Sequence, residues 1–286
     1  MKYAWIKDNS SSFTVQLMCE CLGVSRSAYY GWVNTPLSAK QLEDEKLAEK
    51  IKMIFNKHKK RYGARRIKKV LAKEGLTVSR RRITRLMQAS GLYCRAKRKF
   101  KVTTDSKHNL PISPNLLERN FTTNNPNQVY VGDITYIPTQ EGWLYLAVVI
   151  DLFSRQVVGW SMKSHLRASL VNDALLMAIW KRKPPRGLIW HTDRGSQYAS
   201  KSHRALLQDH GIKQSMSRKG DCWDNAVSES FFHTLKVELT HGCNFKTREE
   251  AKNAIFEYIE VYYNRLRMHS ANDYMSPVEF EMAWNF

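Results

Sequence analysis

The order of apolar segments predicts an α/β fold, in which a mixed five-stranded sheet with flanking helices follows an all-α region. Two observations support this prediction. Residues 128–240 alternate β-rich runs with amphipathic helical patterns, which is typical of a layered α/β domain. Residues 1–94 instead show apolar residues at helical spacing, separated by cap and stop residues. We therefore expect a helical region followed by an α/β domain.

Composition and charge favour a globular protein with a polyanionic partner. The 286 residues are 43% hydrophobic and 25% charged, and a chain of this length holds about two domains. The formal net charge is +20, and residues 46–101 alone hold 21 Lys and Arg against two acidic residues. A charge this concentrated predicts binding to nucleic acid upstream of the α/β region.

The sequence gives no sign of export or membrane insertion. It contains no run of about 18 apolar residues, and its start lacks the apolar centre of a secretory signal. The five cysteines form no C-x-x-C pair and no His/Cys zinc pattern, so we expect reduced thiols. These features predict a cytoplasmic protein with no membrane partner.

Residues 1–36 are expected to form a small helical segment. Val15, Met18 and Leu22 share one helix face, Gly23 supplies a stop, and Ser25 can cap a second helix. The pair resembles a helix-turn-helix. Because basic residues are sparse here, a packing hairpin that touches no DNA is an equal alternative.

Residues 40–94 form a more convincing helix-turn-helix domain. Three helices are predicted from apolar stripes at Leu47/Ile51/Ile54, Ile67/Val70/Leu71 and Ile83/Leu86/Met87. Ser79 can cap the third, which is short and basic and follows a tight turn, as suits a DNA groove. Its predicted DNA-binding residues are Arg80, Arg81, Arg82 and Arg85.

Residues 95–127 are predicted to be a basic extended linker. Prolines at 111, 114 and 126 discourage regular structure. Lys97, Arg98 and Lys99 form a basic run, which we expect to lie along DNA.

Residues 128–240 carry the pattern of the predicted sheet. Strands are expected at 128–137, 143–151 and 156–162 as an antiparallel meander, and further strands at 188–192 and 214–217. One helix is expected between the third and fourth strands, one at 200–210, and one after the last strand. This order is that of a ribonuclease H-like core. Residues 241–286 are expected to form a helical extension packed on that core.

Three carboxylates stand where strands or helices begin, end or are interrupted. Asp133 interrupts a β-rich run, and Asp193 follows a short apolar strand. Glu229 lies one turn inside a helix, with 35 residues between it and Asp193. An unpaired charge at such places is unusual for a purely structural residue. Strands and a helix can bring these carboxylates to one end of the sheet, where they could hold two Mg²⁺ ions for phosphoryl transfer.

Five ordered windows identify a resemblance to a known family. They read V-G-D-I-T-Y-I, D-L-F-S-R-Q-V-V-G-W, H-T-D-R-G-S-Q-Y, D-N-A-V-S-E-S-F-F-H-T-L-K and Y-Y-N-R-L-R-M-H-S. They resemble the bacterial insertion-sequence transposases of the copy-out group, whose second reading frame encodes a core similar to retroviral integrase. The resemblance implies that Asp133, Asp193 and Glu229 are the catalytic, metal-binding triad, and that Lys236 belongs to the same motif.

The resemblance also implies an activity and partners. The activity would be cleavage at the 3′ ends of an insertion sequence and transfer of those ends to new DNA, with two Mg²⁺ ions for which Mn²⁺ substitutes. The partners would be double-stranded DNA at the terminal inverted repeats and the target, further copies of the chain, and the product of an upstream reading frame.

Several neighbouring residues have open or secondary roles. Asp151 could be a fourth carboxylate, although capping the L-F-S-R turn is favoured. His191 shares a strand face with Asp193, and a hydrogen-bonded structural role is favoured because imidazole suits zinc better than magnesium. His233 shares the helix face of Glu229, and its role stays open.

Asp224 or Asn225 could cap the glutamate helix, and Asn225 could instead steady the site. Arg218 and Lys219 precede that helix in a loop suited to holding DNA.

Two alternative functions remain at this stage. A ribonuclease H-like nuclease would hydrolyse DNA without joining the cut end to a second strand. A catalytically silent DNA-binding repressor would carry the carboxylates by coincidence. Joined products distinguish a transposase from both.

Overall fold

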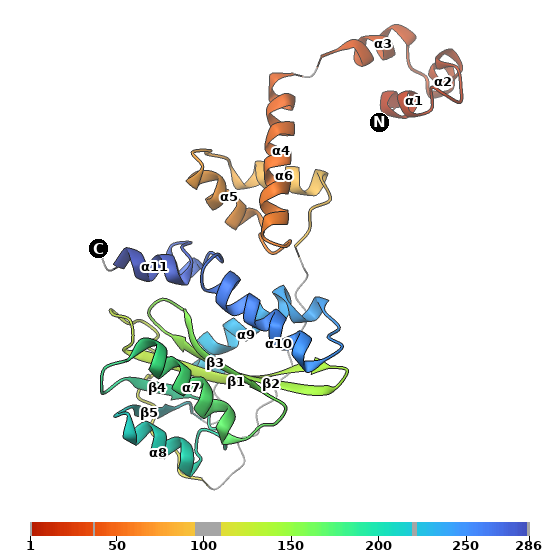
Figure 1. Cartoon of the computed structure of the whole chain (residues 1–286). Helices are drawn as coiled ribbons and strands as arrows, with labels where there is room; N and C mark the ends of the chain where they lie inside the picture. The colour runs from red at the N-terminus through yellow and green to blue at the C-terminus, as the bar shows by residue number, and fades with distance from the viewer. Residues whose placement is uncertain (1, 37, 95–109, 219–221, 285–286) are drawn as a thin grey trace. The chain divides into compact units, whose positions relative to one another are not determined.

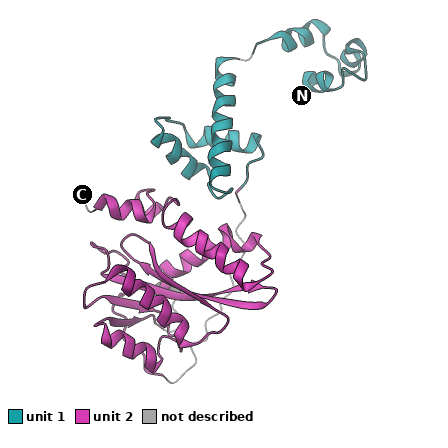
Figure 2. Ribbon diagram, in the orientation of Figure 1, with its two compact units in different colours: residues 1–93 teal, residues 94–286 magenta. Residues whose placement is uncertain are grey.

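The computed structural model describes residues 2–36, 38–94, 110–218 and 222–284, and its chain separates into two compact units. Unit 1 spans residues 1–93 and unit 2 spans residues 94–286 (Figure 2). Among the described helices, none is both long and apolar enough to cross a membrane.

Unit 1 begins with three short helices. They are α1 (Lys2–Asp8), α2 (Val15–Leu22) and α3 (Arg26–Asn34). The predicted pair corresponds to α2 and α3, whereas α1 was not predicted. Gly23 ends α2 with φ of 61°, a left-handed conformation that glycine adopts without strain. The Ser25 hydroxyl accepts a hydrogen bond from Ala28 N, as its predicted capping role requires.

The second part of unit 1 is a three-helix domain made of α4 (Ala39–Lys57), α5 (Ala64–Lys73) and α6 (Arg80–Ala89). Ser38 and Gln41 form a capping box at the start of α4, and Ser79 caps α6 through Arg82 N. All three predicted apolar stripes pack into its core. The fully buried members include Ile51, Tyr62, Ile67, Leu71 and Ile83.

Unit 2 is built on a five-stranded mixed sheet in the order β3-β2-β1-β4-β5 (Figure 1). The strands are β1 (Val129–Thr139), β2 (Gly142–Asp151), β3 (Val157–Lys163), β4 (Ile189–Thr192) and β5 (Lys213–Met216). The first three form the predicted antiparallel meander, and β4 pairs in parallel with both β1 and β5. This topology confirms the ribonuclease H-like fold.

Helices cover both faces of the sheet. On one face, α7 (Ala168–Arg182) packs on β2 and β3, and α8 (Lys201–Asp209) packs beside β5 (Figure 1). On the other face, α9 (Ala226–Glu238) packs on β1, and α10 (Arg248–Phe256) packs on β1 and β2. A short 3-10 helix, η1 (Cys222–Asn225), leads into α9. The carboxylates predicted to be catalytic belong to the second face.

The C-terminal residues pack on the core. A π-helix (Glu257–Tyr263) continues α10, and α11 (Pro277–Trp284) ends the described chain. The Asn264 side chain accepts from Val157 N at 3.0 Å and donates to Val157 O at 2.9 Å. Arg267 donates to Glu238 of α9 at 2.9 Å. These buried bonds fasten the extension to both β3 and α9.

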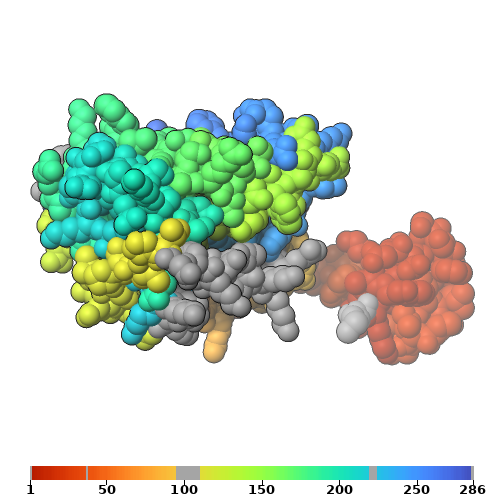
Figure 3. Space-filling model, turned by 90° about the horizontal axis from the view of Figure 1, so that it is seen from below, coloured from red at the N-terminus to blue at the C-terminus, as the bar shows by residue number. Residues whose placement is uncertain are grey.

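Residues 110–127, predicted as part of the linker, contact the core. As expected, they contain neither a helix nor a strand. However, Met216 N donates to Pro114 O, and Leu116 N donates to Ser215 Oγ at 2.8 Å. Figure 3 shows this segment, in yellow, lying against the cyan surface of unit 2. The segment therefore belongs to the edge of the sheet at β5.

Candidate active site and nucleic-acid surface

The parallel pairing of β1 and β4 brings two aspartates to the same level of the sheet. The last paired residues are Val131 and His191, and the same offset places Asp133 level with Asp193 two residues further on. Because strand residues alternate between faces, both aspartates lie on the face covered by α9. Asp193 directly follows the C-terminal end of β4, where the chain leaves the sheet.

Helix α9 brings Glu229 and Lys236 to the two aspartates. Glu229 lies in the first turn of α9, and Lys236 lies seven residues later on the same helix face. Burial raises the pKa of Asp133 well above its usual range, and the charges of Asp193 and Glu229 raise it further. Bonding to Ile134 N and the charge of Lys236 oppose this rise. Asp133 therefore interacts electrostatically with the other three predicted residues.

Local backbone bonds orient the two aspartates. Asp133 Oδ1 accepts from Ile134 N at 2.8 Å, and Asp193 Oδ1 accepts from Gly195 N at 2.9 Å. Burial also raises the pKa of Glu229. The raised pKa values of Asp133 and Glu229 both show that burial disfavours the charged form of these carboxylates.

The donor set fits a hard divalent cation. Carboxylate oxygens are the ligands that Mg²⁺ prefers. The Tyr198 hydroxyl is buried and lacks a hydrogen-bond partner in the described part of the chain, and burial and the charges of Asp193 and Asp133 raise its pKa. A hydrated cation beside these carboxylates would give that hydroxyl a partner. As the described side chains stand, no three His, Cys, Asp or Glu residues already form a metal-ligating group.

On the opposite face of the sheet, buried contacts of Trp190 hold together the two strands that carry the aspartates. The Trp190 indole lies over Gly132, where any added Cβ would collide with the ring. Trp190 Nε1 donates to His203 Nε2 at 2.9 Å, and His203 Nδ1 bonds Asn172 Oδ1 at 2.7 Å. Burial lowers the pKa of His203 to about 4, so it stays neutral with its proton on Nδ1. Gly132 therefore permits the close approach of β1 and β4 beside Asp133.

His191 is a buried hydrogen-bonded residue, as its favoured structural role predicted. Its Nε2 bonds Asp224 O at 2.9 Å, so Nε2 carries the proton and Nδ1 accepts from Ser215 Oγ at 2.8 Å. Burial lowers the pKa of His191, which favours this neutral form. Since Ser215 also accepts from Leu116 N, His191 joins β4, β5, η1 and the docked segment.

A cluster around Asp224 was missed from the sequence. The Asp224 carboxylate is fully buried and accepts bonds from Arg218, from Arg119 Nε at 3.2 Å and from Asn115 Nδ2 at 3.0 Å. Bonding to Arg218 lowers the pKa of Asp224 strongly. Its partners at 115 and 119 lie more than a hundred residues away, and no spacing signal connects them.

Three secondary predictions can now be compared with the structure. Neither Asp224 nor Asn225 caps α9 with its side chain, so the capping prediction is wrong. Asn225 occupies the N-cap position, yet its Oδ1 is buried without a partner among the described residues. Asp151 accepts from Phe153 N and Asn127 N, which confirms the favoured turn role. His233 is half-buried on α9, and the described contacts assign it no role.

The predicted DNA-binding arginines of α6 fall into two classes. Arg80 and Arg81 are exposed at the start of the helix. Arg82 Nε donates to Asp44 at 2.6 Å, and Arg85 donates to the same carboxylate. Lys97, Arg98, Lys99 and Lys219 lie outside the described residues. DNA contact by any of these residues stays a prediction, but Arg82 and Arg85 also hold α6 to α4.

Comparison with known proteins agrees with this architecture. A family model described as "Integrase core domain" matches residues 123–222, a second of the same description matches residues 229–283, and an "HTH-like domain" model matches residues 41–100. The chain is 46% identical over 283 residues to "Transposase InsF for insertion sequence IS3A" of Escherichia coli K12, covering 98% of both chains. It is also 46% identical over 268 residues to an "Insertion element IS600 uncharacterized 31 kDa protein" of Shigella sonnei, covering 94% of this chain and 98% of that one.

Similar solved structures include two viral integrases. The simian T-cell lymphotropic virus intasome in complex with PP2A regulatory subunit B56 gamma aligns with a TM-score of 0.46 and 19% identity, covering 75% of this chain and 70% of that one. The HTLV-2 integrase catalytic core domain in complex with magnesium aligns with a TM-score of 0.42 and 21% identity, covering 55% of this chain and 97% of that one.

Proposed function

We propose a two-metal mechanism of DNA strand cleavage and strand transfer for this chain, which belongs to the family of insertion-sequence transposases with an integrase core domain. The mechanism is a refinement of the transposase and polynucleotidyl transferase function that the family defines. One observation supports it above the others: the charges of Asp193 and Glu229 raise the pKa of Asp133, so the three carboxylates lie close enough to interact.

The residues of the cluster have separate tasks in this mechanism. Asp133, Asp193 and Glu229 would together hold the metal ions through their carboxylate oxygens. Two Mg²⁺ ions, or Mn²⁺ in their place, would supply Lewis-acid activation of the attacking and leaving oxygens of an in-line displacement at phosphorus. Lys236, which faces Asp133, would pair with a DNA phosphate beside the carboxylates. Tyr198 would donate its otherwise unpartnered hydroxyl hydrogen bond inside the site.

Strand transfer needs no covalent bond between protein and DNA. The first displacement frees a 3′-hydroxyl, which becomes the nucleophile of the second. Holding that hydroxyl near the next phosphorus lets it outcompete water through proximity. We assign the holding of the DNA end to the basic helices of unit 1, with Arg80 and Arg81 nearest the bases or phosphates.

The remaining partners also belong to this proposal. The DNA substrates would be the terminal inverted repeats and a target duplex. The active form would be an oligomer of the chain on DNA, acting with or fused to the product of an upstream reading frame. A transposase must hold two ends at once, which is the functional reason for more than one copy.

A strand-transfer assay tests the proposal. The full chain, with any upstream product supplied, is incubated with a labelled element end and Mg²⁺ or Mn²⁺, and products are separated on a denaturing gel. Strands longer than the substrate are expected. Ca²⁺ should support binding with little chemistry, because its larger and looser shell misplaces the attacking oxygen. Shortened strands alone, with the ends verified, would favour the hydrolytic nuclease instead.

A further inference from the structure

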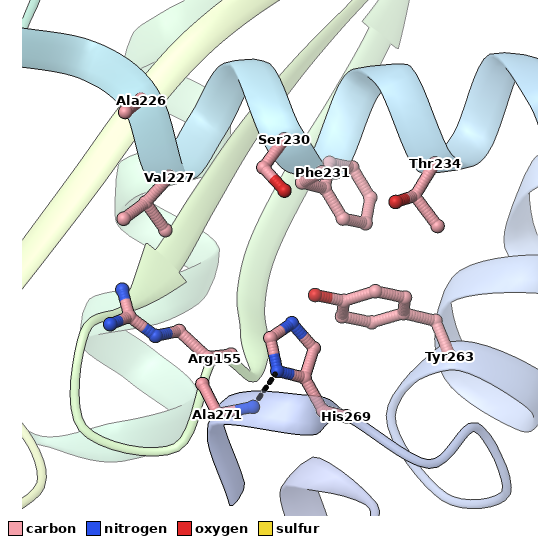
Figure 4. A pocket seen from close by; sticks show the side chains of 9 residues that line it. All are labelled: Arg155, Ala226, Val227, Ser230, Phe231, Thr234, Tyr263, His269 and Ala271. Carbon is pink, nitrogen blue, oxygen red and sulfur yellow. Dashed lines mark hydrogen bonds between the residues drawn. The ribbon is translucent and has the colours of Figure 1, made fainter. Parts of the chain in front are cut away.

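The first turn of α9 carries Glu229 but is not held in place by a local cap. Its N-cap residue, Asn225, makes no side-chain capping hydrogen bond. One side of this turn borders a cavity of about 220 Å³, and Figure 4 shows Ala226 and Val227 on the wall that α9 forms. The position of Glu229 therefore depends on contacts made by the residues just before α9.

Asp224, which precedes the N-cap residue, is tied to the strand that leads to Asp193. His191 of β4 lies two residues before Asp193, and its Nε2 donates to the Asp224 backbone oxygen at 2.9 Å. The His191 ring is also fixed from its other side, because Ser215 Oγ donates to Nδ1 at 2.8 Å. His191 and Ser215 are fully buried, so water does not compete for these bonds. They hold β4 and the start of α9 at a fixed separation.

A second route leads from the other side of Asp193 to the same residue. Arg194 follows Asp193, and its Nε donates to Ser217 O at 2.6 Å. The next residue, Arg218, donates to the Asp224 carboxylate from its backbone N at 2.9 Å and from its guanidinium at 2.9 Å. Asp224 is thus tied to the residues that flank Asp193 on both sides.

The docked segment 110–127 completes the surroundings of Asp224. Asn115 Nδ2 donates to Asp224 Oδ2 at 3.0 Å, and Arg119 Nε donates to Oδ1 at 3.2 Å. These partners and Arg218 leave the carboxylate fully buried. Because the segment precedes β1 in the chain, it can fix the start of α9 only while it is docked at the edge of the sheet.

We propose that Asp224 is a positioning residue that sets the separation of Asp193 and Glu229. Docking of the segment completes this role through Asn115 and Arg119. The proposal rests on the metal-dependent function proposed above. Contacts that orient metal-binding side chains from outside commonly change metal affinity by roughly 10- to 100-fold when they are lost. The affinity for a divalent cation should therefore depend on Asn115 and Arg119, although neither belongs to the carboxylate cluster.

Two matched variants of the docked segment test the proposal in the full chain. Asn115→Asp keeps the side-chain oxygen that accepts from Leu117 N and Glu118 N. It loses the amide donor and places a second negative charge beside Asp224. Asn120→Asp is the control, because it makes the same change in the same segment, and Asn120 is not among the partners of Asp224 in the described structure. The added charge alone would attract a cation, so weaker metal binding by Asn115→Asp reports lost positioning.

Mn²⁺ is the probe, and the electron paramagnetic resonance signal of the free ion measures how much is bound. The titration uses protein without DNA, at a temperature where every variant is folded. Binding that Glu229→Gln abolishes is assigned to the carboxylate cluster. For that binding we expect the same Kd in the wild type and Asn120→Asp, and a Kd about tenfold higher in Asn115→Asp. A merely structural role would lower Tm and leave the Kd of the folded protein unchanged.

Arg119→Met serves as a second variant in case Asn115→Asp does not fold. The Arg119 side chain is 49% exposed, so its loss should cost less stability. It removes a positive charge, which by itself would favour cation binding, so a higher Kd again reports positioning.

Strand cleavage gives an independent readout of the same effect. The Mn²⁺ concentration for half-maximal cleavage should rise about tenfold in Asn115→Asp, while its affinity for DNA stays at the wild-type value. If Mn²⁺ does not bind the cluster of the wild type, the metal-dependent function and this inference both fail. If it binds the wild type, Asn115→Asp and Arg119→Met with the same Kd, the metal site stands and the positioning role is overturned.

Discussion

The carboxylates of the predicted active site and the carboxylate of Asp224 belong to neighbouring parts of unit 2 but have opposite electrostatic environments. Asp224 receives Arg218, Arg119 and Asn115, and its pKa falls. Asp133 accepts one backbone N–H from Ile134, and its pKa rises despite the opposing charge of Lys236. The fold therefore surrounds Asp224 with cationic partners, whereas the charges that act on Asp133 include two further carboxylates.

The same contrast extends to the other buried acids. Glu238 is paired with Arg267, and Glu281 is paired with Arg182 at 2.7 Å. Each pair joins the core to the C-terminal residues. Paired carboxylates thus fasten segments of unit 2, while the predicted catalytic cluster gathers negative charge that a divalent cation can neutralise. The predictions below test that division, beginning with the largest effect.

Removing one charge from the predicted catalytic cluster should abolish chemistry while sparing the fold. We expect Glu229→Gln to lower strand cleavage by at least about 10³-fold, equivalent to roughly 4 kcal/mol of transition-state stabilisation. DNA affinity should stay near the wild-type value. Asp133→Asn should do the same and should also raise Tm without metal, because it removes the repulsion that raises the pKa of Asp133. Near-normal cleavage by Glu229→Gln would remove it from the triad.

Asp151 is intermediate between Asp224 and the predicted catalytic carboxylates. It is buried and accepts hydrogen bonds, but its ion pair is weak. Burial raises its pKa to about 6 from 3.8, and Arg182 lies 3.7 Å away. The folded state therefore holds the proton more tightly, so this group lowers stability as pH rises from about 4 to about 6, by up to about 3 kcal/mol. Above that range its contribution is constant.

Denaturant unfolding of the wild type and Asp151→Asn at pH 4 to 8 measures this effect. The variant loses one of the two acceptors that bond Asn127 N and Phe153 N, so it starts with lower stability at pH 4. We expect its free energy of unfolding to gain on the wild type as pH rises to about 6. A constant difference between the two proteins across this range would contradict the raised pKa.

Removing the Asp224 carboxylate should lower the free energy of unfolding, in addition to any effect on catalysis. Asp224→Asn leaves Arg218 and Arg119 without their carboxylate, but their side chains are 54% and 49% exposed and regain water. We therefore expect the free energy of unfolding to fall by about 2 kcal/mol, which is less than the loss for a fully buried ion pair. Equilibrium unfolding measures this loss, and Asp209→Asn on an exposed surface is the control. Equal stabilities of the two variants would argue against a stabilising role for the contacts of Asp224.

The comparison also separates what the sequence could predict from what it could not. Period-2 and helical spacings located every strand of the sheet, because each strand buries one face or both. Asp133, Asp193 and Glu229 were recognisable as candidates because a charge interrupts an apolar element, and the resemblance to transposases implied their roles. The partners of Asp224 were not predictable, because Asn115 and Arg119 reach it only after the segment 110–127 docks on β5.

Local rules also failed where tertiary contacts replaced them. Asn225 has the residue type and position of an N-cap, but it adopts φ of −117° and ψ of 22° after a 3-10 turn and makes no capping bond. The helical extension predicted for residues 241–286 contains the helix Arg248–Phe256, but this helix changes to a π-helix at Glu257, which a helical period alone does not reveal. Arg155 was predicted only as part of a turn, because its bond to Phe121 O depends on a contact with a distant segment of the chain.

The smallest predicted effect concerns unit 1. It tests whether arginines that are paired within the fold contribute less to DNA binding than exposed ones. Arg82 and Arg85 are paired with Asp44, whereas Arg80 and Arg81 are exposed at the start of α6. Replacing Arg80 and Arg81 with Ala should flatten the slope of log DNA affinity against log salt by up to about two units, with little change in Tm. Replacing Arg82 and Arg85 should instead lower Tm, because the contact between α6 and α4 is lost, and should flatten the slope less. If the two double variants change the slope equally, pairing with Asp44 does not withdraw an arginine from DNA, and all four side chains contact the duplex.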